Sequence, residues 1–234
     1  MGVRARPDDR IGAWDVDAGG LQMKLRFYLI CRFPRLIEKL VLLRKCADNM
    51  KCVCIGRIVL NEKLMIILET SRLILRQMHG GDAAFMLRLL NEPTWLRFIG
   101  DRGVRSLDDA RNYILNGAVA SYARHGYGFY LIERKDTGVA IGMCGLAKRD
   151  YLEHADIGFA LLPEYVAQGY AHEAAIAVVD YAKLSLGLPR LLATTRVDNT
   201  SSIQLLEKIG MRFEKTILHP DGDRELNLFA IDLV

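Results

Sequence analysis

The chain has 234 residues, of which 51% are hydrophobic and 26% charged. These proportions are ordinary for a globular protein, and the length suits one domain with an appendage. Residues 1–64 hold 13 Lys and Arg against 7 Asp and Glu, whereas the remainder holds 19 against 21. The main part of the chain is therefore not basic, and its composition argues against a nucleic-acid partner.

The cysteines also limit the possible functions. Cys31, Cys46, Cys52 and Cys54 lie in the first quarter of the chain, and Cys144 lies in the main part. Their spacing matches no usual zinc-site pattern and has no histidine nearby, so we predict no metal site. The chain shows no secretory signal pattern and no apolar run that could span a bilayer. We therefore expect a cytoplasmic protein with free thiols.

Residues 1–64 differ from the rest, and we interpret them as an N-terminal extension of a domain that spans residues 65–234. Residues 21–45 combine Lys and Arg with apolar side chains. A basic amphipathic helix of this kind could lie on an anionic membrane surface. We favour a helix packed on the domain, or a segment that is not normally translated, and we expect no stable membrane insertion.

Hydrophobic periodicity predicts alternating strands and helices from residue 65 onward. The predicted strands are 72–76, 126–133, 139–146, 153–162, 190–197, 211–216 and 224–232. The predicted helices are 82–90, 106–124, 172–186 and 198–209. The second of these helices opens with a capping-box pattern from Ser106 to Asp109. The last has Gly210 just past its end, where a left-handed residue commonly terminates a helix.

The strand that ends before Pro163 has two unlike faces. Alternation places Ala155, Ile157, Phe159 and Leu161 on one face and Asp156, Gly158, Ala160 and Leu162 on the other. The second face is nearly free of bulky side chains and has a single carboxylate at its start. Such a face is typical of a strand that a ligand or another backbone approaches closely.

A glycine-containing turn, Gln168 to Ala171, follows this strand and opens the helix 172–186. The first N–H groups of a helix lack partners within it, and the helix dipole attracts anions to that end. Gly169 would let the backbone approach a bulky anion such as a pyrophosphate. A glycine in a strand–loop–helix unit is equally compatible with an ordinary turn.

Taken together, these motifs resemble those of the GCN5-related N-acetyltransferases (GNAT), and most closely the RimJ/RimL-type branch, which acetylates N-terminal amines of ribosomal proteins. The resemblance is carried by Asp156-Ile-Gly-Phe159, by Pro163-Glu-Tyr165 and by Ala167-Gln-Gly-Tyr-Ala-His-Glu-Ala174. Two residues depart from the pattern. Val166 stands where many members carry Arg, Gln or Trp, and Ala167 stands where a glycine is usual.

The resemblance covers residues 65–234 and implies the α/β (α+β) acyl-CoA N-acyltransferase fold. In that fold a mixed, mostly antiparallel central sheet of about six to seven strands is flanked by about four helices. Residues 65–76 are similar to the usual start of this branch, with Met65 in the place of the initiator methionine. This similarity is the reason to interpret residues 1–64 as an upstream extension.

The resemblance also implies acetyl-CoA as co-substrate. The residues expected to hold it are Ala167, Gln168, Gly169, Tyr170 and Ala171 at the turn and Phe159, Ala160 and Leu161 beside the thioester. Backbone N–H groups near the thioester would stabilise the developing oxyanion. A second signature, Asn199-Thr-Ser-Ser202, matches the family's Asn-x-x-Ser. Asn199 would hold the pantetheine arm and Ser202 would donate a proton to the sulfur, although capping alone also explains Asn199.

Asp156 is the first candidate for the general base, because it occupies the position of the branch's acidic residue. Glu173 is the second, although the helix dipole favours an acid there in any case. His154 is the third. Cys144 is not expected to carry the acyl group, because the sequence shows no activating base beside it.

The sequence therefore predicts transfer of an acetyl group from acetyl-CoA to a primary amine by direct attack in a ternary complex. The branch implies a protein N-terminal amine, whereas other relatives modify amino acids, polyamines or antibiotics. Trp95, Phe98 and Tyr113 could line the acceptor side, and a homodimer is compatible with the pattern. A non-catalytic CoA-binding sensor is the alternative from another class, and it is kept open by Val166 and Ala167.

Overall fold

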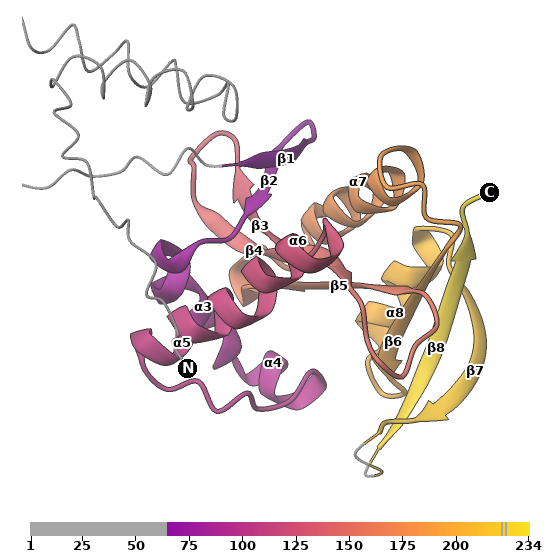
Figure 1. Cartoon of the computed structure of the whole chain (residues 1–234). Helices are drawn as coiled ribbons and strands as arrows, with labels where there is room; N and C mark the ends of the chain where they lie inside the picture. The colour runs from indigo at the N-terminus through magenta and orange to yellow at the C-terminus, as the bar shows by residue number, and fades with distance from the viewer. Residues whose placement is uncertain (1–64, 221, 223) are drawn as a thin grey trace, which may run out of the picture. The chain divides into compact units, whose positions relative to one another are not determined.

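The computed structural model describes residues 65–234 except residues 221 and 223 (Figure 1). The predicted extension, with its basic segment and four of the cysteines, lies outside the described residues. Within the described part, no helix is long and apolar enough to cross a membrane.

An eight-stranded sheet forms the centre of the domain, in the order β1-β2-β3-β4-β5-β6-β8-β7. Its strands are β1 (Ile66–Glu69), β2 (Leu73–Gln77), β3 (Phe129–Arg134), β4 (Ala140–Ala147), β5 (Ala155–Leu161), β6 (Arg190–Arg196), β7 (Arg212–Leu218) and β8 (Glu225–Asp232). Every neighbouring pair is antiparallel except β5 and β6, so the predicted mixed sheet is confirmed. The sequence prediction left out β1, whose three consecutive apolar residues show no alternation.

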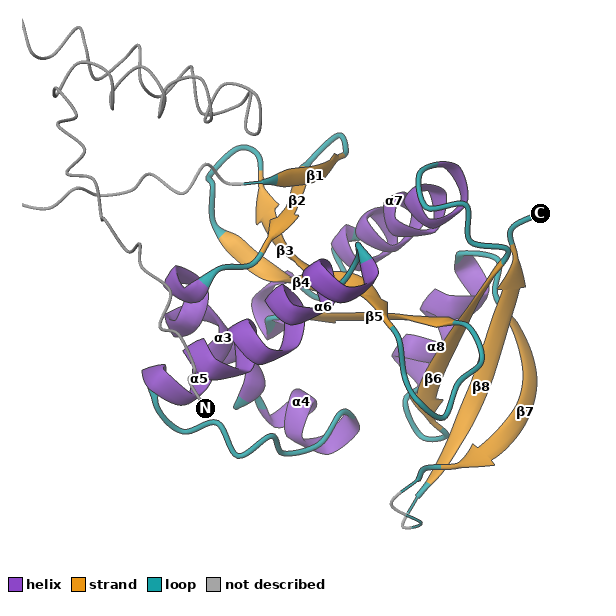
Figure 2. Cartoon of the chain, in the orientation of Figure 1, coloured by secondary structure: helices purple, strands orange, loops and turns teal. Residues whose placement is uncertain are grey.

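The helices connect these strands along the chain and flank the sheet (Figure 2). They are α3 (Ala83–Leu90), α4 (Pro93–Phe98), α5 (Leu107–Ile114), α6 (Ala120–His125), α7 (Tyr170–Leu184) and α8 (Thr200–Lys208). One π-helical segment, Leu115–Val119, joins α5 to α6, so the predicted helix 106–124 is continuous. The sequence prediction missed α4 because it took Pro93 as a helix end. Pro93 instead opens α4, where a missing N–H costs nothing.

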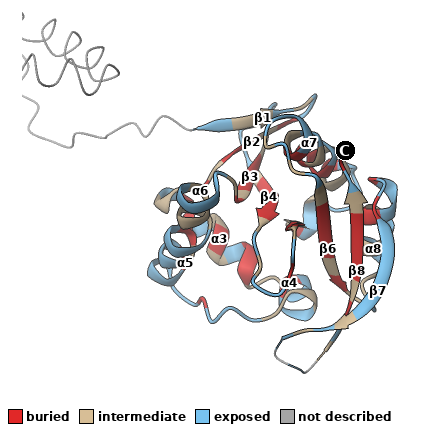
Figure 3. Cartoon of the chain, turned by 45° about the vertical axis from the view of Figure 1, so that its right-hand side comes forward, coloured by how far each residue is buried: buried red, intermediate tan, exposed pale blue. Residues whose placement is uncertain are grey.

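Two apolar layers cover the two faces of the sheet. Helices α7 and α8 bury one cluster, which includes Ala155 and Ile157 of β5. Helices α3, α4 and α5 bury the other, which includes Leu162. The predicted faces of the β5 stretch are therefore confirmed. Figure 3 shows the buried strands β6 and β8 beside the mostly exposed edge strand β7.

The helix starts follow the expected capping chemistry. The Ser106 hydroxyl accepts a hydrogen bond from the Asp109 N–H at 3.1 Å, and the Asp109 carboxylate accepts one from the Ser106 N–H at 2.9 Å. The predicted capping box is thereby confirmed, with aspartate in the place of the more usual glutamate. It fixes the start of α5, which forms part of the layer opposite α7.

Candidate active site

Strands β5 and β6 are parallel neighbours that separate along their length. They pair at Ala155 with Leu191 and at Asp156 with Leu192, and no further pairs follow. β5 nevertheless continues to Leu161, paired with β4 from Asp156 to Leu161. Because alternate backbone groups of a strand point to opposite sides, the later residues of β5 present N–H and C=O groups toward the side that β6 has left.

The bare face of β5 is filled from within the sheet. A Cβ atom on Gly158 would lie 3.0 Å from the Phe129 ring, and Phe129 pairs with Gly145, the β4 partner of Gly158. The absence of bulk at Gly158 therefore accommodates a phenyl ring of β3. The sequence led us to expect that a ligand or another backbone approaches this face closely. At Gly158 the group that approaches is a side chain.

The turn before α7 exposes a row of backbone donors. Ala167 and Gly169 both have left-handed backbone, with φ values of 62° and 82°. Within the described residues, the N–H groups of Ala167, Gln168 and Gly169 donate no hydrogen bond. The N–H groups of the first turn of α7 have no intrahelical acceptor. Consecutive donors at the positive end of a helix dipole form a site suited to a phosphate group.

Asn199 and Ser202 stand at the corresponding end of β6. The Asn199 side-chain oxygen accepts a hydrogen bond from the Ser202 N–H at 3.2 Å and caps α8. The Asn199 amide nitrogen donates no hydrogen bond to the described residues, so capping leaves it available to a ligand. Because β5 and β6 are parallel, the turn after β5 and Asn199 after β6 lie beyond the same edge of the sheet.

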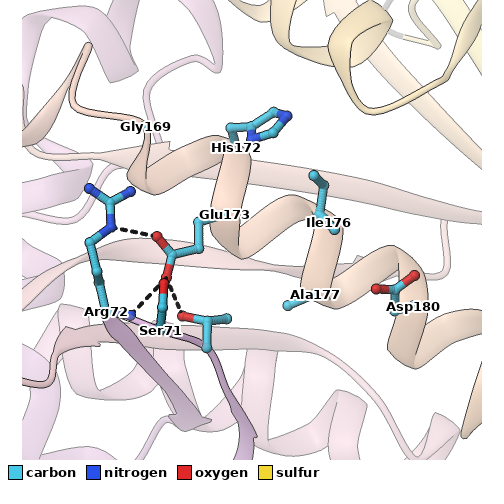
Figure 4. A pocket seen from close by; sticks show the side chains of 9 residues that line it. Ser71, Arg72, Gly169, His172, Glu173, Ile176, Ala177 and Asp180 are labelled. Atoms are coloured by element: carbon cyan, nitrogen blue, oxygen red, sulfur yellow. Dashed lines mark hydrogen bonds and ion pairs between the residues drawn. The ribbon is translucent and has the colours of Figure 1, made fainter.

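Glu173 ties the first turn of α7 to the β1–β2 turn (Figure 4). Its carboxylate accepts hydrogen bonds from the Thr70 hydroxyl at 2.5 Å, the Ser71 hydroxyl at 3.0 Å and the Arg72 N–H at 2.9 Å. The Arg72 Nε donates to the second carboxylate oxygen at 2.6 Å. These groups line an open groove beside α7 that also includes His172.

Arg72, which is bound by Glu173, also contacts the turn Ala167–Gly169 and the first residue of α7. The Arg72 guanidinium donates to the Gln168 carbonyl at 3.1 Å and lies 4.5 Å from the centre of the Tyr170 ring. Burial alone would raise the pKa of Glu173, but the hydrogen bonds from Thr70 and Arg72 outweigh it and lower this pKa to about 2. A carboxylate with so low a pKa is a poor proton acceptor at neutral pH. The contacts of Glu173 are those of a structural residue.

Asp156 lies at the last pair of the β5–β6 ladder and is only 2% exposed. One carboxylate oxygen accepts a hydrogen bond from the Thr194 N–H of β6 at 3.1 Å, and the other forms an ion pair with the Arg149 Nε. Burial raises the pKa of Asp156, and the contacts with Arg149 and Thr194 oppose that rise.

Among the described residues, Cys144 is not placed to act as a nucleophile, and no metal-binding cluster is present. Cys144 is fully buried, and burial raises the pKa of its thiol to about 12, so it stays protonated at neutral pH. Among the described residues, no group of three or more His, Cys, Asp or Glu side chains is arranged to hold a metal ion. Trp95 is buried in the core, whereas Phe98 and Tyr113 are half-buried.

Residues 72–212 match the model of the acetyltransferase (GNAT) domain family. The chain belongs to the GNAT acetyltransferases. It is 35% identical over 149 residues to the uncharacterized N-acetyltransferase YoaA of Bacillus subtilis, a match that covers 63% of this chain and 84% of the relative. The predicted acyltransferase class is thereby confirmed.

Two solved GNAT-type structures share the fold. The RimL ribosomal L7/L12 alpha-N-protein acetyltransferase, solved with coenzyme A, superposes with a TM-score of 0.62 at 21% identity, over 72% of this chain and 98% of that one. The spermidine N-acetyltransferase of Vibrio cholerae, solved with CoA and spermine, superposes with a TM-score of 0.59 at 20% identity, over 70% and 97%. At these identities the likeness supports the fold alone and does not identify the acceptor of this enzyme.

For this GNAT enzyme, the site falls into two groups. The predicted cofactor residues from Ala167 to Ala171, together with Asn199 and Ser202, follow the ends of β5 and β6. Asp156 lies five positions before the end of β5 at Leu161, which is roughly 17 Å along a strand. The catalytic and cofactor roles assigned to these residues from the sequence stay predictions.

Sequence reasoning missed three residues that this site depends on. The Arg72 side chain and the Thr194 backbone N–H carry no motif of their own, because their roles come from contacts with residues far away in the chain. Arg149 lies in the loop between β4 and β5, and its pairing with Asp156 leaves no periodic signal in the sequence. For Glu173, the sequence offered one indication of a structural role, namely an acidic side chain in the first turn of a helix.

Ala167 is expected to be strained, because its left-handed φ of 62° suits glycine and brings the Cβ of other residues too close to the following carbonyl oxygen. We expect Ala167→Gly to raise the free energy of unfolding by about 0.5–1 kcal/mol, the relief being partly offset by the greater freedom of glycine in the unfolded chain. Urea titration of both proteins measures this difference. A destabilised Ala167→Gly variant would contradict the assigned conformation.

Proposed function

We propose that this enzyme transfers the acetyl group of acetyl-CoA to a primary amine by direct attack in a ternary complex. The observation that carries this proposal is the separation of β5 from β6 after two residue pairs, with the donor row of Ala167–His172 beyond the end of one strand and Asn199 beyond the other. The donor row would hold the pyrophosphate, and the pantetheine arm would lie between the strands.

The chemical step requires a neutral amine beside the thioester. The amine nitrogen attacks the carbonyl carbon, the carbon–sulfur bond breaks, the nitrogen loses one proton and the thiolate gains one. N–H groups on the open side of Phe159 to Leu161 would stabilise the negative oxygen of the intermediate. The Ser202 hydroxyl, in the first turn of α8, would supply the proton to sulfur. Fully buried Cys144 offers no route through an acylated thiol.

We infer that the acceptor is a protein N-terminal amine, as in the RimJ/RimL-type branch. The RimL enzyme is named as an alpha-N-protein acetyltransferase. The motif Asp156-Ile-Gly-Phe159 resembles that of the branch. The spermidine enzyme of similar fold shows that a polyamine is a competing class. Polyamines require acidic partners, and the candidate acid nearest the strand opening, Asp156, is already paired with Arg149.

Mass spectrometry of products from an acceptor panel tests this inference. Full-length protein would be incubated with acetyl-CoA and a peptide with a free N-terminus, the same peptide with a blocked N-terminus, spermidine and free amino acids. We expect acetylation of the free peptide alone, at its α-amine. Acetylation of spermidine or an amino acid in preference to the peptide would overturn the assigned acceptor class. Acetyl-CoA binding without any acetylated product would instead favour a sensor.

Asn199→Asp separates the two roles of Asn199. Aspartate caps a helix as well as asparagine does, so stability is expected to change by less than about 0.5 kcal/mol. The variant loses the amide donor and adds a charge beside the pantetheine arm, so the Kd for acetyl-CoA is expected to rise about tenfold. Calorimetric titration and thermal melting measure the two effects. An unchanged Kd would limit Asn199 to capping.

A further inference from the structure

The separation of β5 from β6 begins at a single residue. Asp156 forms the last backbone pair with β6, opposite Leu192. β6 itself stays paired with β8 from Arg190 to Arg196, so its other side is fixed throughout. The opening between β5 and β6 is therefore not a frayed sheet edge. It is a local departure of one strand from a neighbour that remains held.

The Asp156 side chain takes over the hydrogen bond that the separating backbone gives up. The Thr194 N–H lies two residues beyond the last pair on β6 and would donate to the β5 backbone if the ladder continued. It donates instead to the Asp156 carboxylate at 3.1 Å. A backbone N–H that is shielded from water and has no partner destabilises the fold, and this contact gives the half-buried Thr194 N–H a partner at the point of separation.

Arg149 occupies the second oxygen of the same carboxylate. Its side chain is 33% exposed, so it shields Asp156 from solvent while it remains in contact with water itself. Burial raises the pKa of the half-buried Tyr113 of α5, and the charges of Arg102 and Arg149 oppose that rise. The ion pair therefore occupies the Asp156 carboxylate at the start of the strand opening.

These contacts conflict with the role of Asp156 as general base. A base must come within hydrogen-bond reach of the proton it removes, directly or through one water. Both Asp156 oxygens already have partners, and the residue is 2% exposed. An incoming amine would meet the guanidinium of Arg149 before it met the carboxylate.

We propose that Asp156 is a positioning residue: through Thr194 and Arg149 it sets how far β5 and β6 separate, and thereby where the thioester lies. The inference rests on the proposed function for the identity of the bound group. The amine would then lose its proton to water at the open side. An acid is required at this position because two acceptor oxygens are needed, one for the Thr194 N–H and one for Arg149.

Two variants of the full-length protein distinguish positioning from proton transfer. Asp156→Ala removes both acceptor oxygens. The double variant Asp156→Asn with Arg149→Gln keeps an acceptor for the Thr194 N–H and replaces the ion pair by two neutral amides of similar shape. Asp150→Asn, an exposed change in the same loop, serves as the control. The readouts are deuterium exchange of the Thr194 amide, the Kd for acetyl-CoA and the pH profile of kcat/KM.

For Asp156→Ala we expect exchange of the Thr194 amide to accelerate, and the Kd for acetyl-CoA to rise, by about tenfold or more. The double variant is expected to recover most of both losses and to stay within about tenfold of the wild-type kcat. The acid limb of kcat/KM is expected to move with the pKa of the acceptor amine when that amine is changed.

A double variant with normal Thr194 exchange and normal Kd, but with kcat lower by about 10²–10⁴, would identify Asp156 as the base and overturn the proposal. Unchanged Thr194 exchange in Asp156→Ala would overturn it as well. If the wild type bound no acetyl-CoA, the proposed function would fail, and the exchange measurement would still decide whether Asp156 holds β6.

Discussion

Replacement of Gly169 by glutamate is expected to abolish acetyl-CoA binding, with a rise in Kd of more than about 100-fold. Gly169 has a left-handed φ of 82°, and a Cβ atom there would lie 3.3 Å from the Arg72 guanidinium. The added carboxylate would also stand among the N–H groups that are proposed to receive the pyrophosphate, and it would repel that anion. Isothermal calorimetry of the full-length protein measures the effect.

Gly138→Glu is the matched control. Gly138 also has a left-handed φ, of 66°, and nothing lies within 4 Å of an added Cβ atom there. The two variants therefore share the cost of a left-handed glutamate and differ in their distance from the donor row. We expect Gly138→Glu to keep the wild-type Kd. Saturable binding by Gly169→Glu at wild-type affinity would show that the pyrophosphate lies elsewhere.

Replacement of Glu173 by alanine is expected to lower the free energy of unfolding by about 2–4 kcal/mol. The change removes the acceptor of four hydrogen bonds, two of them from Arg72, and leaves a guanidinium without its carboxylate. For a domain of this size the melting temperature should fall by about 5–15 °C. Asp180→Ala is the control, because Asp180 lines the same groove but is exposed.

The contribution of Glu173 should also depend on pH in a defined direction. Its pKa falls from 4.5 to about 2 on folding. Because the folded-state value is the lower one, the stabilisation is fully present above about pH 4.5 and is lost as the pH falls toward 2. The difference in unfolding free energy between wild type and Glu173→Gln should shrink over that interval. A difference that stayed constant down to pH 2 would exclude the charge as its source.

The sequence was sufficient for the features that depend on local patterns. The two faces of β5 and the capping box at Ser106 follow from periodicity and from the chemistry of helix starts. β1 and α4 were missed because each is short, and because Pro93 opens a helix as readily as it ends one.

The parts that could not be predicted are those decided by contacts distant in the sequence. The Glu173 carboxylate meets the backbone of Arg72, 101 positions away, and Asp156 meets Thr194, 38 positions away. A conspicuous acid on a strand is equally compatible with a catalytic base and with a buried hydrogen-bond acceptor. Only burial and partners separate the two, and both follow from tertiary packing rather than from local pattern.

Release of free CoA thiol from acetyl-CoA, measured with and without a primary amine, tests the central claim most directly. The account predicts that full-length protein releases thiol only when an acceptor amine is present, with one acetylated amine formed for each thiol released. Thiol release that is independent of amine, or an acetylated enzyme formed in its absence, would contradict direct transfer in a ternary complex.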